Sequence, residues 1–428
     1  MKDLKHMIYF EHLLQDANNE LVRQEKEEGK HPLAYTCFHV PEVLLNLEGC
    51  FSVRLRAPNM GSTEIATYYM ANSACEYSRA LLERSIEGNY KFIDALIGVD
   101  VCEPMNRCME NMEILKIHDE ENEHFFRCYL DIPYSDDEDC AIHLAEQVSR
   151  KILKQLEAHY QIDVSDQAIR KAVAEFNEMC RIIQEMGDFR KADNPVITGS
   201  EFHKIVLCTY VCPKNKILPY LVETLEELKH REPDKKNHYK SRVVVVGSEI
   251  DDPGMIELIE ESGALVVADR FCYGSIPGRS EIILNDEEDA LIQIIRKNLL
   301  DTECPRQCAE HKMKYRKDHV KELVEEYHAD GAIYEQMKFC TYWSYERTLA
   351  SHIMPAEYDV PVLSIDRPYR SVGSGQLRTR VQAFVESLEI KKIKAERQKK
   401  VQAGEATQIP YNPQTEQGSG KYYSATTR

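Results

Sequence analysis

The chain has 428 residues, of which 43% are hydrophobic and 29% are charged, an ordinary composition for a globular protein. Its formal net charge is -18, and an acidic chain is poorly suited to general nucleic-acid binding, which requires neutralisation of phosphates. No run of about 18 apolar residues predicts a membrane span and no secretory signal is evident, so we expect a cytoplasmic protein with neither nucleic acid nor membrane as a partner.

Residues 1–135 are predicted to form an α/β domain. Short apolar runs predict strands, and the segment between the first two predicts a helix. The strands are expected at 51–56, 92–99 and 125–133, and the helix at 63–82. Two cysteines accompany these elements, because Cys75 lies in or at the start of the predicted helix and Cys102 follows the second strand.

Residues 136–235 predict a helical connecting section. The acidic residues at 136–139 suit the start of a helix, and apolar residues then recur at helical spacing. Ser165 is expected to cap the next helix. Cys180 lies on the apolar stripe of that helix, so we expect a buried and inert thiol.

Residues 236–390 predict a second α/β domain. Strands at 242–247, 264–269, 332–337 and 361–366 alternate with helices at 253–262, 289–300, 316–328 and 376–388. Such alternation implies a parallel sheet covered on both faces. Cys340 closely follows the third of these strands. The predicted fold class is therefore α/β, with two Rossmann- or flavodoxin-like parallel-sheet domains joined by a helical section.

Residues 391–428 are predicted to form a tail outside the second domain. The tail carries eight Lys or Arg residues against three Glu, which contrasts with the acidic remainder of the chain. Its beginning is basic, and the rest is polar with few large apolar residues. We expect a frayed helix followed by disorder.

The chain contains 14 cysteines, and without an export signal this number favours metal or redox chemistry over disulfides. Ligands in open α/β sheets bind beyond the carboxyl ends of strands. The thiolates of Cys75, Cys102 and Cys340 could hold one iron–sulfur cluster there, with one iron left open for a substrate oxygen. The alternative is three unrelated buried thiols.

Short motifs spread over residues 30 to 390 occur in a distinctive order. They are Pro41-Glu42, Cys75 with Arg79, Cys102 with Arg107, the segments 247–253 and 263–269, Cys272, Lys338-Phe339-Cys340 and the closing segment 375–384. In this order they resemble the 2-hydroxyacyl-CoA dehydratase family, which includes the D-component of 2-hydroxyglutaryl-CoA dehydratase. That family is related to benzoyl-CoA reductase subunits and to double-cubane cluster proteins.

The resemblance implies an iron–sulfur subunit of a 2-hydroxyacyl-CoA dehydratase, a lyase of anaerobic metabolism that eliminates water from a CoA thioester. Cys75, Cys102 and Cys340 would then ligate a [4Fe-4S] cluster. An ATP-dependent Fe–S activator protein would supply one electron, and a ketyl radical formed on the acyl-CoA substrate would expel the 2-hydroxyl group. The partner would be a paralogous dehydratase subunit in a heterodimer, or a second copy in a homodimer.

Cys272, Cys304 and Cys308 form a second candidate set of ligands. In the double-cubane proteins, extra cysteines from comparable regions hold a second cubane, so these three would complete a double-cubane [8Fe-9S] cluster. The alternative is that these thiols line the same cleft or pack between helices.

Glu42 is the candidate acid or base. A carboxyl in a dry cleft can hold a raised pKa and move protons. The alternative for Glu42 is a carboxylate that marks the start of a helix.

Three other functions stay open at this point. The first is a double-cubane cluster reductase of small molecules, and the second is a benzoyl-CoA reductase-type subunit. The third is a non-catalytic Fe–S partner subunit, and a scaffold without metal is the simplest reading. The acyl group of the substrate does not follow from the sequence.

Overall fold

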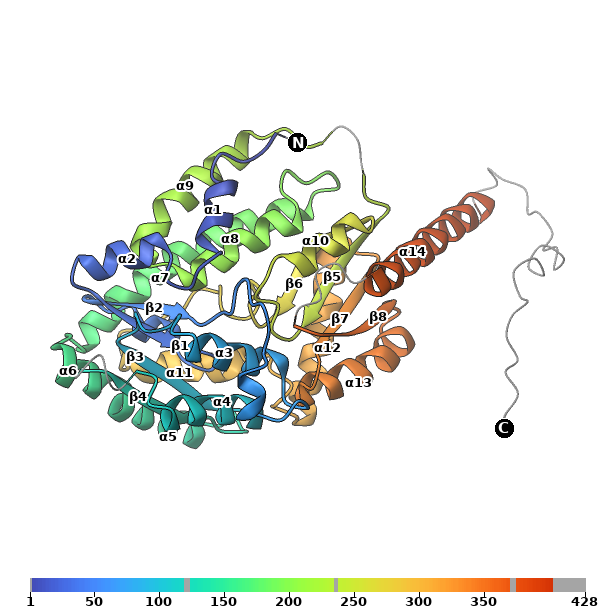
Figure 1. Cartoon of the computed structure of the whole chain (residues 1–428). Coiled ribbons are helices and arrows are strands. Elements are labelled where there is room, and N and C mark those ends of the chain that lie inside the picture. Colours follow the sequence, from blue (N-terminus) through green and yellow to red (C-terminus); the bar gives the residue numbers. More distant parts are fainter. Residues whose placement is uncertain (1, 119–123, 235–237, 370–374, 403–428) are drawn as a thin grey trace, which may run out of the picture.

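The computed structural model describes residues 2–118, 124–234, 238–369 and 375–402, which contain two four-stranded parallel sheets (Figure 1). The first sheet has the order β2-β1-β3-β4, with β1 (His31–Tyr35), β2 (Cys50–Arg54), β3 (Ala95–Asp100) and β4 (Phe126–Asp131). The second has the order β6-β5-β7-β8, with β5 (Ser241–Gly247), β6 (Ala264–Phe271), β7 (Gly331–Met337) and β8 (Val362–Arg367). The predicted α/β class with two parallel sheets is confirmed.

Helices connect the strands and cover the sheets (Figure 1). Those before and within the first sheet are α1 (Met7–Leu13), α2 (Glu20–Glu27), η1 (Glu42–Leu45), η2 (Ala66–Tyr68), α3 (Glu76–Ile86) and α4 (Glu103–Ile114). Between the sheets come α5 (Glu138–Val148), η3 (Ser149–Leu153), α6 (Lys154–Tyr160), α7 (Asp166–Asp188), η4 (Phe189–Lys191), α8 (Gly199–Val211) and α9 (Lys214–His230). The remaining helices are α10 (Gly254–Glu261), α11 (Ala290–Asp301), α12 (Glu310–Glu326), α13 (Thr341–Glu357) and α14 (Gly375–Gln402).

Strand β1 lies inside the first sheet, although the sequence did not predict it. Leu33 pairs with Ser52 of β2 on one side and with Ala95 of β3 on the other. The strand has only five residues and begins His31-Pro32, so it carries no long apolar or alternating signal. Pairing with two neighbours that arrive later in the chain stabilises it.

The helix predicted at 63–82 is wrong in its first half. Helix α3 begins only at Glu76, and the preceding segment is a loop that contains the short η2. The buried carboxylate of Glu83 accepts hydrogen bonds from the backbone N–H of Ile65 at 3.3 Å and of Ala66 at 2.6 Å. These bonds hold the loop against α3, and Cys75 becomes the residue that precedes the helix.

The second sheet follows the predicted strands closely. The four valines at 243–246 of β5 are fully buried, as expected for a strand covered on both faces. Helix α14 continues to Gln402, past the predicted end at Leu388, because Lys, Arg, Glu, Gln and Ala are good helix formers. The predicted disorder of residues 403–428 lies outside the described residues.

The carboxyl end of β2 in the first sheet is tied to that of β6 in the second. Helix α8 contacts both strands. Arg54 ends β2 and donates to the carbonyl oxygen of Cys272 at 2.5 Å, directly after β6. The predicted domain boundaries at 135 and 235 fall between β4 and α5 and between α9 and β5. No helix in the described ranges is both long and apolar enough to cross a membrane.

Candidate functional site

Cys75, Cys102 and Cys340 each occupy the residue directly before the first turn of a helix. Cys75 precedes α3, Cys102 lies between β3 and α4, and Cys340 lies between β7 and α13. Burial raises the pKa of all three thiols, and in each case a backbone N–H of the following turn opposes that rise. The positive end of a helix also favours a thiolate. All three positions therefore suit a sulfur that carries negative charge.

These three thiols lie within electrostatic reach of one another. Burial raises the pKa of Cys340 well above its usual value, and the neighbouring Cys75 and Cys102 raise it further. Burial likewise raises the pKa of Cys102, and Cys75 adds to that rise. The structure thus brings together three sulfurs from three separate segments of the chain.

A second group of thiols lies beside the first. Burial raises the pKa of Cys272, and Glu249, Cys304 and Cys37 add to the rise. Cys304 also acts on Cys102 and Cys340, so the two groups are neighbours. We call the six residues Cys37, Cys75, Cys102, Cys272, Cys304 and Cys340 the thiol cluster.

Cys308 is exposed, whereas Cys37 takes part in the thiol cluster. The sequence pattern places Cys308 with Cys272 and Cys304 and gives no indication of Cys37. Cys37 lies just beyond the end of β1, at the edge where ligands bind in such sheets. A prediction of β1 would have identified it.

Glu249 is a carboxyl of the site that the sequence pattern does not single out. It follows β5, its side chain is 17% exposed, and one carboxylate oxygen is 3.5 Å from Arg54 Nη2. Burial, with Asp251 and Glu335 nearby, raises its pKa to about 7 against the opposing effect of Arg54. The thiol cluster therefore has a carboxyl poised near neutral pH beside it.

The donor set of the thiol cluster fits iron–sulfur chemistry better than a single metal ion. Within the described ranges, no three His, Cys, Asp or Glu side chains lie close enough to hold one ion. An iron–sulfur cluster takes each thiolate on a different iron, so its ligands stand farther apart than those of one ion. Sulfur ligands from several segments therefore satisfy the requirement of such a cofactor.

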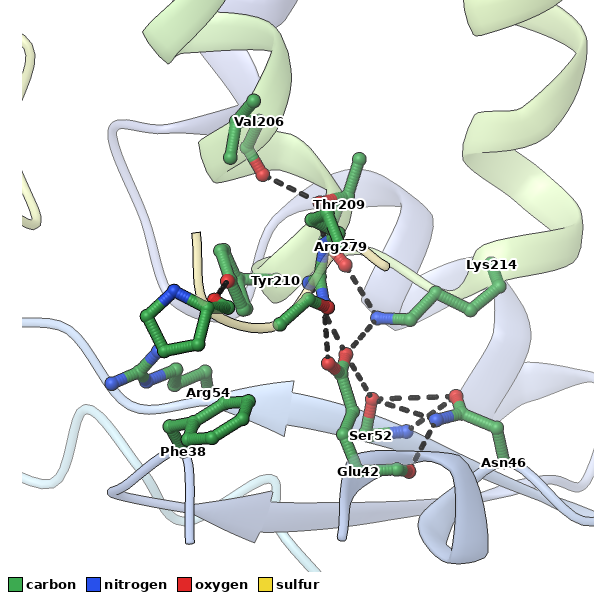
Figure 2. Close-up of polar contacts among 12 residues, drawn as sticks. Phe38, Glu42, Asn46, Ser52, Arg54, Val206, Thr209, Tyr210, Lys214 and Arg279 are labelled. Carbon is green, nitrogen blue, oxygen red and sulfur yellow. Dashed lines mark hydrogen bonds and ion pairs between the residues drawn. The ribbon is translucent and has the colours of Figure 1, made fainter. Parts of the chain in front are cut away.

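Glu42 begins η1 and lies in a buried ion-pair cluster (Figure 2). Arg279 Nη1 donates to Glu42 Oε2 at 2.7 Å, and Lys214 Nζ is 2.7 Å from Oε1. Burial opposes ionisation of Glu42, but the charges of Arg279 and Lys214 outweigh it and lower the pKa to about 2. The raised pKa considered from the sequence is therefore wrong, and Glu42 is a fixed carboxylate.

The partners of Glu42 carry no sequence signal. Arg279 is 237 positions away in the chain, in the loop after β6, and Lys214 begins α9. Arg279 is further held by Thr209 Oγ1 at 2.8 Å and lies 3.6 Å from the centre of the Tyr210 ring. Folding alone brings α8, α9 and this loop to η1.

The chain matches a family model described as 2-hydroxyglutaryl-CoA dehydratase, D-component, over residues 37–388. It is similar to the (R)-phenyllactyl-CoA dehydratase beta subunit of Clostridium sporogenes, at 21% identity over 89% of this chain and 97% of that protein. It is similar to the (R)-2-hydroxyglutaryl-CoA dehydratase beta subunit of Acidaminococcus fermentans, at 22% identity over 86% and 95%. A benzoyl-CoA reductase subunit of Thauera aromatica is 21% identical over 89% and 97%. The matched range contains the whole thiol cluster.

Proposed function

Because the chain belongs to the 2-hydroxyglutaryl-CoA dehydratase D-component family, we propose that it is one subunit of a dehydratase, a lyase that removes water from a 2-hydroxyacyl-CoA thioester. Two of its relatives are beta subunits of such dehydratases. The observation that carries the proposal is the thiol cluster, four of whose members lie within three residues of a strand end.

Cys75, Cys102 and Cys340 would hold a [4Fe-4S] cluster. When bound, it would supply single electrons and an open iron for the radical dehydration that the family resemblance implies. The protein contributes three helix starts, whose N–H groups favour negative charge on these sulfurs. The buried guanidinium of Arg54 lies beside Glu249 and the backbone of Cys272, and it supplies positive charge to a site rich in thiolates.

The partner of this subunit would be a paralogous dehydratase subunit. Two relatives are beta subunits and a third is a subunit of a reductase, so assembly with further subunits is the rule among the relatives described above. A homodimer is the alternative. An ATP-dependent Fe–S activator protein would deliver the electron, and an acyl-CoA would be the substrate.

A second candidate function is a double-cubane cluster reductase. The observation that favours it is the position of Cys37, Cys272 and Cys304 beside the first three thiols. Six thiols could hold a double-cubane [8Fe-9S] cluster, with Cys37 in the place that the sequence pattern assigns to Cys308. This arrangement would suit reduction of a small molecule rather than dehydration.

Iron and sulfide counting on the full-length protein, purified without oxygen, tests both functions. We expect about four irons per chain for the dehydratase and about eight for the double-cubane reductase. Cys340→Ser should lower the iron content and change the electron paramagnetic resonance spectrum of the reduced protein.

Cys180→Ser is the matched control, because Cys180 is fully buried on α7 and interacts with Arg279 and Glu42 instead of the thiol cluster. It should leave the iron content unchanged. Colourless wild-type protein, or equal iron in the two variants, would refute the proposed cofactor.

A further inference from the structure

A pocket of about 530 Å³, part of it open to solvent, lies beside the Glu42 ion-pair cluster. Four aromatic rings contribute to its walls, those of Tyr35, Phe38, Phe176 and Tyr210. Because Tyr35 is the last residue of β1, the pocket lies beyond the carboxyl edge of the first sheet, where α/β proteins bind ligands. Phe38 directly follows Cys37, so the pocket and the thiol cluster share one segment.

The charged groups around the pocket are already engaged with one another. Glu42 is bound by Arg279 and Lys214, and Lys297 pairs with Asp301 at the rim. The rest of the wall is largely apolar. A charged group that entered this space would lose its water and find these charges already occupied.

Two polar atoms of the pocket lining are buried without a hydrogen-bond partner, Tyr35 Oη and Asn298 Oδ1. Tyr35 is only 1% exposed. The amide nitrogen of Asn298 donates to the carbonyl oxygen of Phe38 at 3.3 Å, which leaves its Oδ1 as a free acceptor. Unpartnered buried polar atoms are costly in a folded protein, and a ligand that bonds to them relieves the cost. A hydroxyl group can donate to Asn298 and accept from Tyr35.

We propose that this pocket binds the acyl part of the substrate, and that it selects an apolar aryl or branched-alkyl acyl group with a hydroxyl over one that ends in a carboxylate. The inference rests on the proposed function and defines its substrate class. The rim residues Gly278, Ser280, Lys297 and Asp301 also line a neighbouring polar hollow of about 1030 Å³. The polar remainder of a CoA thioester therefore has space beside the pocket.

Isothermal titration calorimetry on the full-length protein, without activator and therefore without turnover, tests this selection. The probes are phenyllactyl-CoA, its analogue without the hydroxyl group, and 2-hydroxyglutaryl-CoA. Phenyllactyl-CoA should bind at least about tenfold more tightly than 2-hydroxyglutaryl-CoA. Tyr35→Phe should weaken the binding of phenyllactyl-CoA about fivefold and leave that of its deoxy analogue unchanged.

Tyr334→Phe is the matched control. Tyr334 lies in β7 of the other sheet, and its hydroxyl is also buried without a partner. Neither substitution removes a hydrogen bond of the protein, so both variants should unfold at the wild-type temperature. Equal effects of the two substitutions on phenyllactyl-CoA binding, or equal affinity for the two hydroxyacyl thioesters, would overturn the inference. Binding does not require iron, so an iron-free protein that keeps the Tyr35 effect would refute the proposed cofactor and leave the pocket standing.

Discussion

At the scale of single residues, the same side chain acquires opposite properties from its neighbours. Glu42 and Glu249 both lie in surroundings where burial disfavours their charge. Two cations lower the pKa of Glu42 to about 2, whereas burial with further carboxyls raises that of Glu249 to about 7. The sequence contains two glutamates, and only their neighbours in space distinguish a fixed anchor from a titrating group.

Glu42→Gln should destabilise the protein, because it leaves Arg279 and Lys214 without their buried counter-charge. We expect the free energy of unfolding at pH 7 to fall by about 3 to 5 kcal/mol. The folded pKa of Glu42, about 2, lies below its usual value of 4.5. The stabilisation by Glu42 is therefore complete above about pH 4.5 and is lost as pH falls toward 2, so the difference between the two proteins should shrink over that range. Urea denaturation at several pH values measures it.

Glu48→Gln is the control for this prediction, because Glu48 forms an exposed ion pair with Lys171. Exposed pairs contribute little to stability, so this variant should unfold close to the wild type at every pH. Equal stability of the two variants would mean that the Glu42 cluster does not hold the fold together.

At the scale of elements, helix starts position the residues of the site. The three thiols selected from the sequence all precede helices, and α8 shows how such a start is fixed. Thr198 Oγ1 accepts a hydrogen bond from the N–H of Glu201 at 3.1 Å, and the Glu201 carboxylate accepts one from the N–H of Thr198 at 3.0 Å. This capping box sets the start of the helix that carries Thr209 and Tyr210 to the Glu42 cluster.

Thr198→Ala should lower the free energy of unfolding by about 1 kcal/mol, because the side chain that satisfies the first turn of α8 is removed. Thr348→Ala is the comparison, since Thr348 lies on the exposed face of α13, where alanine has the higher helix propensity. It should leave stability unchanged or slightly raised. Chemical denaturation of both variants decides the matter, and an equal loss in the two would argue against the cap.

At the scale of the whole molecule, buried arginines join the two sheets. Arg56, which follows β2, donates to the carbonyl oxygen of Asp251 at 2.5 Å and to that of Leu14 at 3.2 Å. It is 3% exposed. Asp251 follows β5 of the second sheet and Leu14 follows α1, so one side chain connects three parts of the chain. These bonds make the two sheets one cooperative unit.

Arg56→Met should lower the free energy of unfolding by about 2 to 4 kcal/mol, because it leaves two buried carbonyl groups without their donor. The connection between the sheets should also weaken. Trp343 is the one tryptophan of the chain and lies in α13 beside the second sheet, so its fluorescence reports on that part. We expect fluorescence and far-ultraviolet circular dichroism to change together in the wild type during urea denaturation, and at different concentrations in the variant.

Arg107→Met is the control for Arg56, because Arg107 pairs with Glu103 and Glu110 on an exposed face of α4. Its two signals should stay coincident. Coincident transitions in Arg56→Met, with a midpoint equal to that of the control, would exclude the proposed role in coupling.

Local patterns in the sequence determined much of this fold. The buried valines at 243–246 predict their strand correctly, and Ser165 caps α7 as expected, because apolar runs and capping side chains act over a few residues. The order of the motifs also indicated the family that the match over residues 37–388 confirmed.

Only the tertiary structure decided the features that depend on partners distant in the chain. Strand β1 is stable because β2 and β3 flank it, and its absence from the prediction hid Cys37. The low pKa of Glu42 depends on Arg279 and Lys214, and the free hydroxyl of Tyr35 is evident only when every neighbour is in place. Charge, burial and hydrogen bonding are properties of neighbours in space, and folding assembles those neighbours from segments that no local pattern connects.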